Sequence, residues 1–201
     1  MSGEIIKSFA TPGNNPFGLA FDGKNLWVGD YDLNRLYRLD RDGAAINSFA
    51  TPAAGMYGIA IDGKHIFCCG DGADLIFQLD FFGNVLKSFV SPGSLPSGLV
   101  FDGKHLYCMD YGVDRIYQLD LNGAALGSFP SPFNTPIGFA FDGKNLYFSD
   151  YGVANLYQID LNGVVLRTLS YLGGVITGLA FDGKFLWAVD AGVDKIHQIA
   201  I

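Results

Sequence analysis

The sequence predicts an all-β fold, a five-bladed β-propeller with four antiparallel strands in each blade. The first observation behind this prediction is that the tripeptide Asp-Gly-Lys recurs with a spacing of forty residues. A fixed period of about 20–50 residues is typical of solenoids and propellers, because one repeat cannot bury its apolar faces alone. The second observation is that some expected strands are apolar at adjacent positions. The third is that the N-terminal segment supplies the outer strand that the last unit lacks. The five copies of the tripeptide begin at Asp22, Asp62, Asp102, Asp142 and Asp182.

Each unit contains two apolar runs joined by a short turn, followed by two alternating segments. In the first unit the turn contains Asp22-Gly23, and an Asp-Gly pair between apolar runs is a strong hairpin signal. The run Leu26-Trp27-Val28 is apolar at adjacent positions, so both faces of this strand must be buried, as in a blade between two neighbours. No stretch favours a helix. The four strands of this unit are expected at residues 18–21, 26–29, 35–39 and 45–49.

The two ends of the chain complement each other. Residues 3–12 align with residues 43–52, so they are expected to contain an outermost strand. The fifth unit ends at Ile201, directly after its third strand. We therefore expect residues 4–10 to pair with residues 195–199 in antiparallel register, which closes the ring without a free sheet edge. We expect one domain over residues 1–201, with blade units at about 18–50, 58–90, 98–130, 138–170, and 178–200 completed by 3–10.

A glycine opens the first strand of every unit, where the inner strands of a propeller converge on the axis. Glycine at such a position indicates either a positive φ angle or a backbone approach too close for a Cβ atom. We expect substitution by a larger residue to destabilise the fold. The five glycines are Gly18, Gly58, Gly98, Gly138 and Gly178.

Composition and charge restrict the function. The 201 residues are 49% hydrophobic and 14% aromatic, which is ample for a core, and 16% are charged. The formal net charge of −7 argues against binding to nucleic acid or to an anionic membrane, because both need a basic surface. No signal peptide is visible, and the three cysteines lack a Cys-x-x-Cys spacing, which favours a reducing compartment. We therefore expect a cytoplasmic monomer whose partner is a small molecule or a protein.

The motif residues of the repeat resemble those of a known family. The segments Pro16–Asp22, Leu26–Asp30 and Asn34–Leu36 resemble the NHL repeat, whose pattern reads Pro-x-Gly-Ile-Ala-x-Asp, Leu-Tyr-Val-x-Asp and Asn-Arg-Ile. The resemblance spans the chain and implies a propeller, since each motif residue is structural. It implies less about function, because NHL propellers and their relatives include protein and RNA binders, lactonases and lyases, usually with more blades. The third unit repeats the pattern at residues 98–102, 106–110 and 114–116.

An aspartate follows the second strand in four of the five units. The loops around this position share one face of a propeller, the usual ligand face. One hypothesis is that these carboxylates converge on a calcium ion at the mouth of the channel. The other hypothesis is that each carboxylate accepts backbone N–H bonds within its own loop. The four residues are Asp30, Asp110, Asp150 and Asp190, and the second unit has Gly70-Asp71 instead.

Aromatic residues accompany the aspartates on the same face. Rings beside carboxylates suit stacking against a sugar or contact with an apolar side chain of a partner. The alternative is that some rings wedge between blades, as is favoured for Phe17. The second unit, with Cys69-Gly70-Asp71, departs most from the others and is where we expect asymmetry. The candidate ligand-binding residues are Tyr31, Tyr111, Tyr151, Tyr57 and Asp71, with Phe17, Phe133 and Tyr171 in the same loops.

The opposite face carries the Asp-Gly-Lys turns and therefore a ring of lysines. Each lysine is close to an aspartate, so we expect local neutralisation and a solvated surface. His65 and His105 occupy equivalent turns but lack a third metal ligand. The five lysines are Lys24, Lys64, Lys104, Lys144 and Lys184.

Catalytic signals are scarce in the sequence. The only glutamate is Glu4, and neither a Gly-x-Ser-x-Gly nor a His-Glu-x-x-His motif is present. We therefore predict no catalytic residue and no cofactor. The sequence favours a non-catalytic binding or interaction module that presents one propeller face to a small neutral ligand, such as a carbohydrate, or to a protein segment. The alternative is a metal-assisted hydrolase or lactonase-like enzyme that uses the aspartate ring with calcium.

Overall fold

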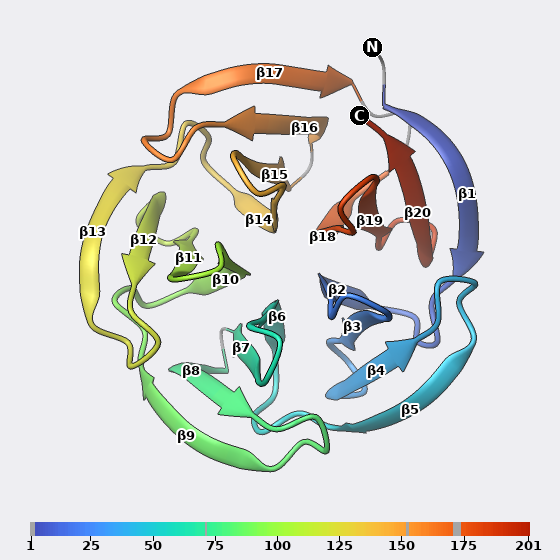
Figure 1. Cartoon of the computed structure of the whole chain (residues 1–201), viewed down its shortest axis with the longest axis horizontal. Coiled ribbons are helices and arrows are strands. Elements are labelled where there is room, and N and C mark those ends of the chain that lie inside the picture. The colour runs from blue at the N-terminus through green and yellow to red at the C-terminus, as the bar shows by residue number, and fades with distance from the viewer. Residues whose placement is uncertain (1–2, 71, 152, 171–173) are drawn as a thin grey trace.

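Five four-stranded antiparallel sheets surround a central axis in the computed structural model of the chain (Figure 1). The structure describes residues 3–70, 72–151, 153–170 and 174–201. Blade 1 contains β2 (Pro16–Phe21), β3 (Leu26–Asp30), β4 (Arg35–Leu39) and β5 (Ala45–Ala50). Blade 2 contains β6 (Met56–Ile61), β7 (Ile66–Gly70), β8 (Ala73–Leu79) and β9 (Val85–Val90).

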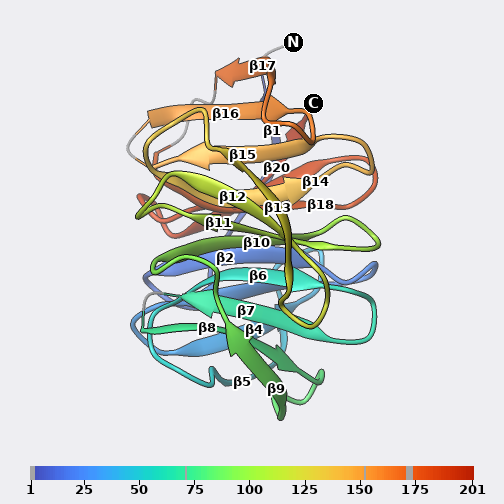
Figure 2. The ribbon, with the colours of Figure 1, turned by 90° about the vertical axis from the view of Figure 1, so that its left-hand side faces the viewer.

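The remaining blades repeat this order from the axis outward. Blade 3 contains β10 (Pro96–Phe101), β11 (Leu106–Asp110), β12 (Arg115–Leu119) and β13 (Ala125–Pro130). Blade 4 contains β14 (Pro136–Phe141), β15 (Leu146–Asp150), β16 (Val153–Ile159) and β17 (Val165–Ser170). Blade 5 contains β18 (Ile176–Phe181), β19 (Leu186–Asp190), β20 (Lys195–Ala200) and β1 (Glu4–Ala10). The prediction of a five-bladed propeller is confirmed, and Figure 2 shows the loops gathered at the two opposite faces of the ring.

The innermost strands begin earlier than the sequence predicted. In blade 1 the strand starts at Pro16, and its register against β3 shifts between Phe17 and Leu19. Gly18 lies at this shift with a φ angle of +66°. A bulge with glycine in the left-handed region lets the strand continue past the irregularity. The glycine therefore lies inside the strand instead of opening it.

Adjacent apolar residues of β3 pack against different blades. Leu26 and Val28 contact the core that contains Trp187 of blade 5. Trp27 faces the other way and packs in the core that contains Ile59 of blade 2. Because side chains alternate along a strand, only burial between two neighbours accommodates such a run. The expected two-sided burial of the second strand is confirmed.

The regular spacing of the inner glycines reflects close packing around the axis. At Gly18 an added Cβ would lie 2.1 Å from the carbonyl oxygen of Tyr57 in blade 2. At Gly178 it would lie 2.6 Å from the carbonyl carbon of Gly18. An added Cβ at each of the other three inner glycines would also lie within 3.0 Å of a neighbouring atom. The predicted requirement for glycine is confirmed, chiefly through close approach.

The N-terminal strand completes blade 5. β1 pairs with β20 in antiparallel register from Glu4 opposite Ala200 to Ala10 opposite Lys195. The ring of Phe9 lies against Trp187, with 6.1 Å between ring centroids. The predicted pairing is confirmed, and Figure 1 shows β1 along the outer edge of the last blade.

Histidine at position 197 distinguishes this closing blade from the others. His197 lies opposite Ser8, whose Oγ is 2.7 Å from Nδ1 of the ring. Burial lowers the pKa of His197 below 6.5, an effect that nearby Asp190 opposes and Lys195 reinforces. The other blades place tyrosine or phenylalanine at the equivalent position, such as Tyr37 opposite Ser48.

The lowered pKa of His197 predicts acid sensitivity of blade closure. The unfolded chain takes up this proton at a higher pH than the folded chain, so the stability from neutral His197 is complete above about pH 6.5 and is lost as the pH falls through the folded-state pKa. Thermal unfolding near pH 7.5 and 5.5 should therefore show a larger loss for the wild type than for His197→Tyr. The wild type should lose more unfolding free energy than His197→Tyr by no more than about 1.4 kcal/mol per pH unit. Equal losses would contradict the prediction.

The described residues contain no helix long and apolar enough to cross a membrane.

The three cysteines are free and buried, and burial raises the pKa of Cys68 to about 12. A buried thiol with a raised pKa is a poor nucleophile. All three cysteines lie in core clusters between blades, so they serve as core residues.

Candidate functional site

Four carboxylates at the ends of the second strands hold the loops of one face together. Asp110 accepts hydrogen bonds from the backbone N–H groups of Leu95, at 2.8 Å, and of Gly112, at 2.9 Å. These donors belong to the loop before β10 and to the loop after β11. One side chain thereby ties two loops of its own blade together. The arrangement agrees with the structural hypothesis for this carboxylate.

The other three aspartates have the same kind of partner. Asp190 accepts from Gly174 at 2.6 Å and from Val175 at 3.0 Å. Asp30 accepts from Leu33 at 2.7 Å, and Asp150 accepts from the backbone N–H of Thr135 at 3.2 Å. Among the described residues, no group of three or more His, Cys, Asp or Glu side chains is placed to hold a metal ion.

Blade 2 lacks this carboxylate because its loop occupies the space. Gly70 stands at the aspartate position, and an added Cβ there would lie 1.7 Å from the carbonyl oxygen of Gly55. The loop before β6 therefore lies directly against β7. Asp71, a candidate ligand-binding residue, lies outside the described residues, as does Tyr171.

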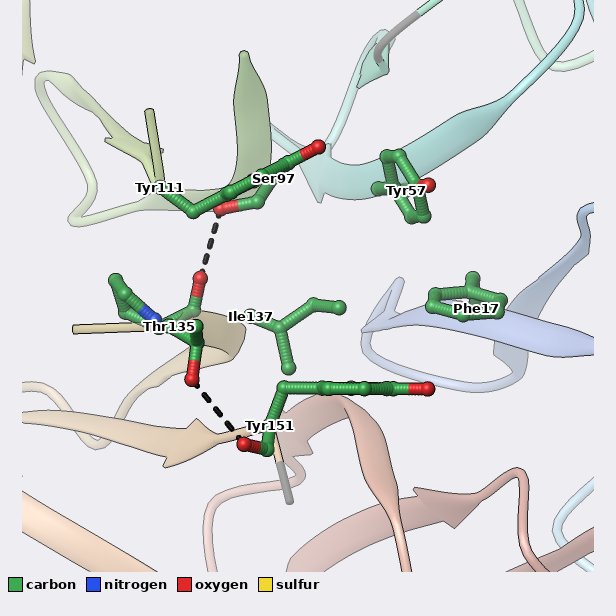
Figure 3. A pocket seen from close by; sticks show the side chains of 8 residues that line it. Phe17, Tyr57, Ser97, Tyr111, Thr135, Ile137 and Tyr151 are labelled. Carbon is green, nitrogen blue, oxygen red and sulfur yellow. Dashed lines mark hydrogen bonds between the residues drawn. The ribbon is translucent and has the colours of Figure 1, made fainter. Parts of the chain in front are cut away.

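A cavity of about 240 Å³ opens on this face of the ring (Figure 3). Its walls come from four blades, because the second residue of each inner strand in blades 1 to 4 points into it. Tyr111 and Tyr151, which follow β11 and β15, complete the walls. The structure thus brings together three of the four candidate tyrosines. The lining residues are Phe17, Tyr57, Ser97, Tyr111, Thr135, Pro136, Ile137 and Tyr151.

The floor of the cavity is the layer of inner glycines. Around these glycines the channel narrows to a space of about 10 Å³. That volume is at the lower limit of what one water molecule needs. The glycine layer therefore closes the cavity at its floor, and the cavity opens on the face that carries the tyrosines.

Tyr31 supports the cavity from behind without lining it. Its ring lies 5.7 Å from Phe17 and 5.3 Å from Tyr57, measured between ring centroids. Phe17 and Tyr57 contact each other edge to face at 4.9 Å. These three rings form one aromatic cluster, which restricts the orientation of the two that face the cavity.

Phe133 is a candidate aromatic that the structure places elsewhere. Its ring stacks on Tyr157 with 3.9 Å between centroids and also contacts Phe148. Phe133 packs against the core cluster between blades 3 and 4, as the alternative hypothesis for these rings proposed. Phe17 was also expected to wedge between blades; its half-buried ring contacts Tyr57 of blade 2 and also lines the cavity.

Ser97 and Thr135 are cavity residues that sequence reasoning missed. The Ser97 hydroxyl donates to the carbonyl of Pro136 at 2.9 Å (Figure 3). The Thr135 hydroxyl has two acceptors within reach, the Asp150 carboxylate and, at 3.1 Å, the carbonyl of Tyr151. A signal for Ser97 was present in the repeat alignment. The residue before the inner glycine changes its chemistry from unit to unit, whereas the glycine does not. The residues at this position are Phe17, Tyr57, Ser97, Ile137 and Thr177.

The cavity has the chemistry of a binding site. Its lining combines aromatic and aliphatic walls with a few hydroxyl groups and contains no carboxylate, imidazole, amine or thiol among the described residues. Apolar walls with a small number of polar groups are typical of ligand pockets. A fold and a site of this kind define a five-bladed β-propeller with an aromatic pocket at the mouth of its channel.

Comparison with known proteins supports the fold. No family model and no curated protein matches the chain, so its resemblance to NHL repeats rests on the motif residues. The chain is similar to glutaminyl cyclase from Myxococcus xanthus, with a TM-score of 0.87 and 14% identity over 98% of this chain and 95% of that one.

Two further solved structures share the architecture. Virginiamycin B lyase from Staphylococcus aureus has a TM-score of 0.60 and 20% identity over 96% of this chain and 68% of that one. The β-propeller domain of Myceliophteria thermophila Cps50 (Swd1) has a TM-score of 0.62 and 11% identity over 99% of both chains. At these identities the similarities show the fold and leave the activity open.

Proposed function

We propose that this protein is a non-catalytic binding module that takes a small ligand, or one side chain of a protein segment, into the aromatic cavity. The observation that carries the proposal is the convergence of Phe17, Tyr57, Tyr111 and Tyr151 on one cavity. Its volume of about 240 Å³ is below the range of about 300–1,000 Å³ for drug-sized ligands, which favours a small occupant.

The cavity lining argues against acid–base catalysis. A general acid or base must lie within hydrogen-bond reach of the reacting atom. The described lining offers hydroxyl groups for this role and no carboxylate or imidazole. The Ser97 hydroxyl already donates to a carbonyl, and that of Thr135 has a carboxylate and a carbonyl as acceptors. The nearby carboxylates of Asp110 and Asp150 accept hydrogen bonds within their loops. The chemical groups of the lining therefore support ligand binding more directly than acid–base catalysis.

The proposal predicts that the tyrosines are required for binding. In a triple variant, Tyr31→Ala, Tyr111→Ala and Tyr151→Ala, we expect affinity for any ligand found on glycan and peptide arrays to fall at least about tenfold. Each ring contact contributes about 0.5–1.5 kcal/mol beyond its buried area. The fold should persist, because Tyr151 is 52% exposed and the other two rings are only half-buried.

A matched control is Phe82→Ala. Phe82 is 82% exposed and lies in the turn between β8 and β9, on the opposite face, so its loss should leave binding unchanged. Retained binding in a folded triple variant would place the site elsewhere. A rise in melting temperature on addition of calcium, with binding that depends on it, would instead favour the alternative of a metal-assisted hydrolase or lactonase that uses the aspartate ring.

A further inference from the structure

We infer that the cavity takes a small organic cation, an ammonium group that carries alkyl substituents. This inference rests on the proposed binding function and names the chemical class of the ligand. Three features carry it: the aromatic walls, the buried carboxylates that precede the tyrosines, and the position of the basic residues.

The aromatic walls present π systems from four blades. Figure 3 shows Tyr111 and Tyr151 extending side by side across the cavity toward Tyr57 and Phe17, with Ile137 between them. Aromatic faces attract cations through their quadrupole, and groups of rings recognise quaternary ammonium ligands. The contacts of Tyr31 with Phe17 and Tyr57 hold two of the rings in place before a ligand arrives.

Three buried carboxylates lie next in sequence to the tyrosines. Asp30, Asp110 and Asp150 directly precede Tyr31, Tyr111 and Tyr151, and they are 3%, 0% and 9% exposed. Their described partners are backbone N–H groups and one hydroxyl. Within the described ranges, no lysine or arginine forms an ion pair with any of the three. Hydrogen bonds stabilise a carboxylate without removing its charge, so the strand ends that precede the tyrosines hold buried negative charge.

Among the described residues, no lysine or arginine lines the cavity. Arg35 and Arg115 bind Ser48 and Ser128 on the outer strands β5 and β13. The lysines of the Asp-Gly-Lys turns lie between the first and second strands of their blades, at the opposite end of those strands. Arg35, Arg115 and Lys195 do lie at the tyrosine end of their strands. The acidic residues at that end outnumber them, so the tyrosine face stays negative; they are Asp30, Asp32, Asp74, Asp110, Asp114, Asp150, Asp190 and Asp194. Cleft walls of low dielectric constant concentrate a negative electrostatic potential within the cleft.

The same features select among cations. A bare ammonium group is strongly hydrated and needs close acceptors to replace its water. The lining places no carboxylate in the cavity among the described residues, so an unsubstituted amine would lose hydration without compensation. Alkyl substituents reduce this loss and contact the rings and Ile137. A small alkylated ammonium ion therefore fits both the walls and the potential.

The test compares choline with its neutral isostere 3,3-dimethylbutan-1-ol. The two have the same shape, and only choline is charged. Isothermal titration calorimetry on the full chain should show choline binding at least about tenfold more tightly than the neutral alcohol. The affinity for choline should fall as ionic strength rises, whereas that for the alcohol should not.

Two pairs of variants separate the contributions of ring and charge. Tyr151→Phe keeps the ring and should keep choline binding, whereas Tyr151→Leu should lower it. Asp150→Asn should weaken choline binding by about threefold or more and leave binding of the alcohol unchanged. The substitution removes the negative charge but keeps the oxygen Oδ1, which accepts both described hydrogen bonds. Asp160→Asn, in the same blade but in the turn on the opposite face, is the control and should change neither ligand.

The outcomes distinguish this inference from the proposed function. Equal binding of choline and the alcohol, lost together in Tyr151→Leu, would overturn the cation while leaving a binding cavity. Weakened binding of both ligands in Asp150→Asn would show that the substitution acts on the structure of the cavity, and it would also overturn the inference of a cationic ligand. No binding of either compound, with a separate ligand that still depends on the tyrosines, would reject alkylammonium as the class. No dependence of any ligand on the tyrosines would reject the cavity itself.

Discussion

Deletion of residues 1–10 is expected to leave a chain that aggregates or loses most of its stability. The deletion removes β1, whose residues pair with β20 from Glu4 to Ala10 and whose Phe9 contacts Trp187. Each lost ladder hydrogen bond contributes about 0.5–1.5 kcal/mol, so the total loss should exceed about 3 kcal/mol. The edge of β20 would also become free to pair with another chain. Urea unfolding and size-exclusion chromatography measure the two effects.

Two further samples test whether the cause is blade closure. Phe9→Ala keeps the strand and should cost less than the deletion. A synthetic peptide of residues 1–12, added in trans, should raise the melting temperature of the truncated chain with increasing concentration, because it binds only the folded form. A truncated chain that stays monomeric and melts like the intact protein would contradict the closure by β1.

The second large effect is expected at Gly18. A methyl group there would lie 2.1 Å from the carbonyl oxygen of Tyr57, and the φ angle of +66° is itself unfavourable for alanine. Backbone strain costs about 1–2 kcal/mol and overpacking about 1–3 kcal/mol, so Gly18→Ala should lose about 2–5 kcal/mol of unfolding free energy. Denaturant unfolding gives this value directly.

Gly23→Ala provides the matched control for this substitution. Gly23 has a φ angle of +92° and no heavy atom within 4 Å of an added Cβ. Its replacement therefore measures backbone strain without a steric clash. If Gly18→Ala costs no more than Gly23→Ala, close approach between blades 1 and 2 does not explain the inner glycine.

Most of the fold follows from local patterns that the repeat displays five times. The Asp-Gly turn at Asp22 and the doubly buried run around Trp27 are properties of one unit, so the sequence alone was enough to predict them. The closing strand was predictable because residues 3–12 copy residues 43–52. The start of the inner strand at Pro16 was not predictable, because a bulge at Gly18 continues the strand past an irregular residue.

The cavity could be predicted only in part. Its tyrosines stand out as aromatic residues in loops, but the repeat pattern does not show which side chains meet across the axis. Ser97 and Thr177 bridge to the next blade from the first strand, through the carbonyls of Pro136 and Pro16. In blade 4 the same kind of bridge comes from Ser149 on the second strand, through the carbonyl of Ile176. Because the donor changes position, alignment of the units does not show the bridge.

The pairing of β1 with β20 determines the order in which the molecule can assemble. Four blades form from contiguous segments, so their contacts are available as soon as each segment is synthesised. Ser8 and His197 are 189 positions apart, and this contact cannot form until nearly the whole chain has emerged. Contacts between distant positions slow folding, because a long loop must close before they contribute. We therefore expect the ring to close late in folding, and until it closes Phe9 lacks its contact with Trp187.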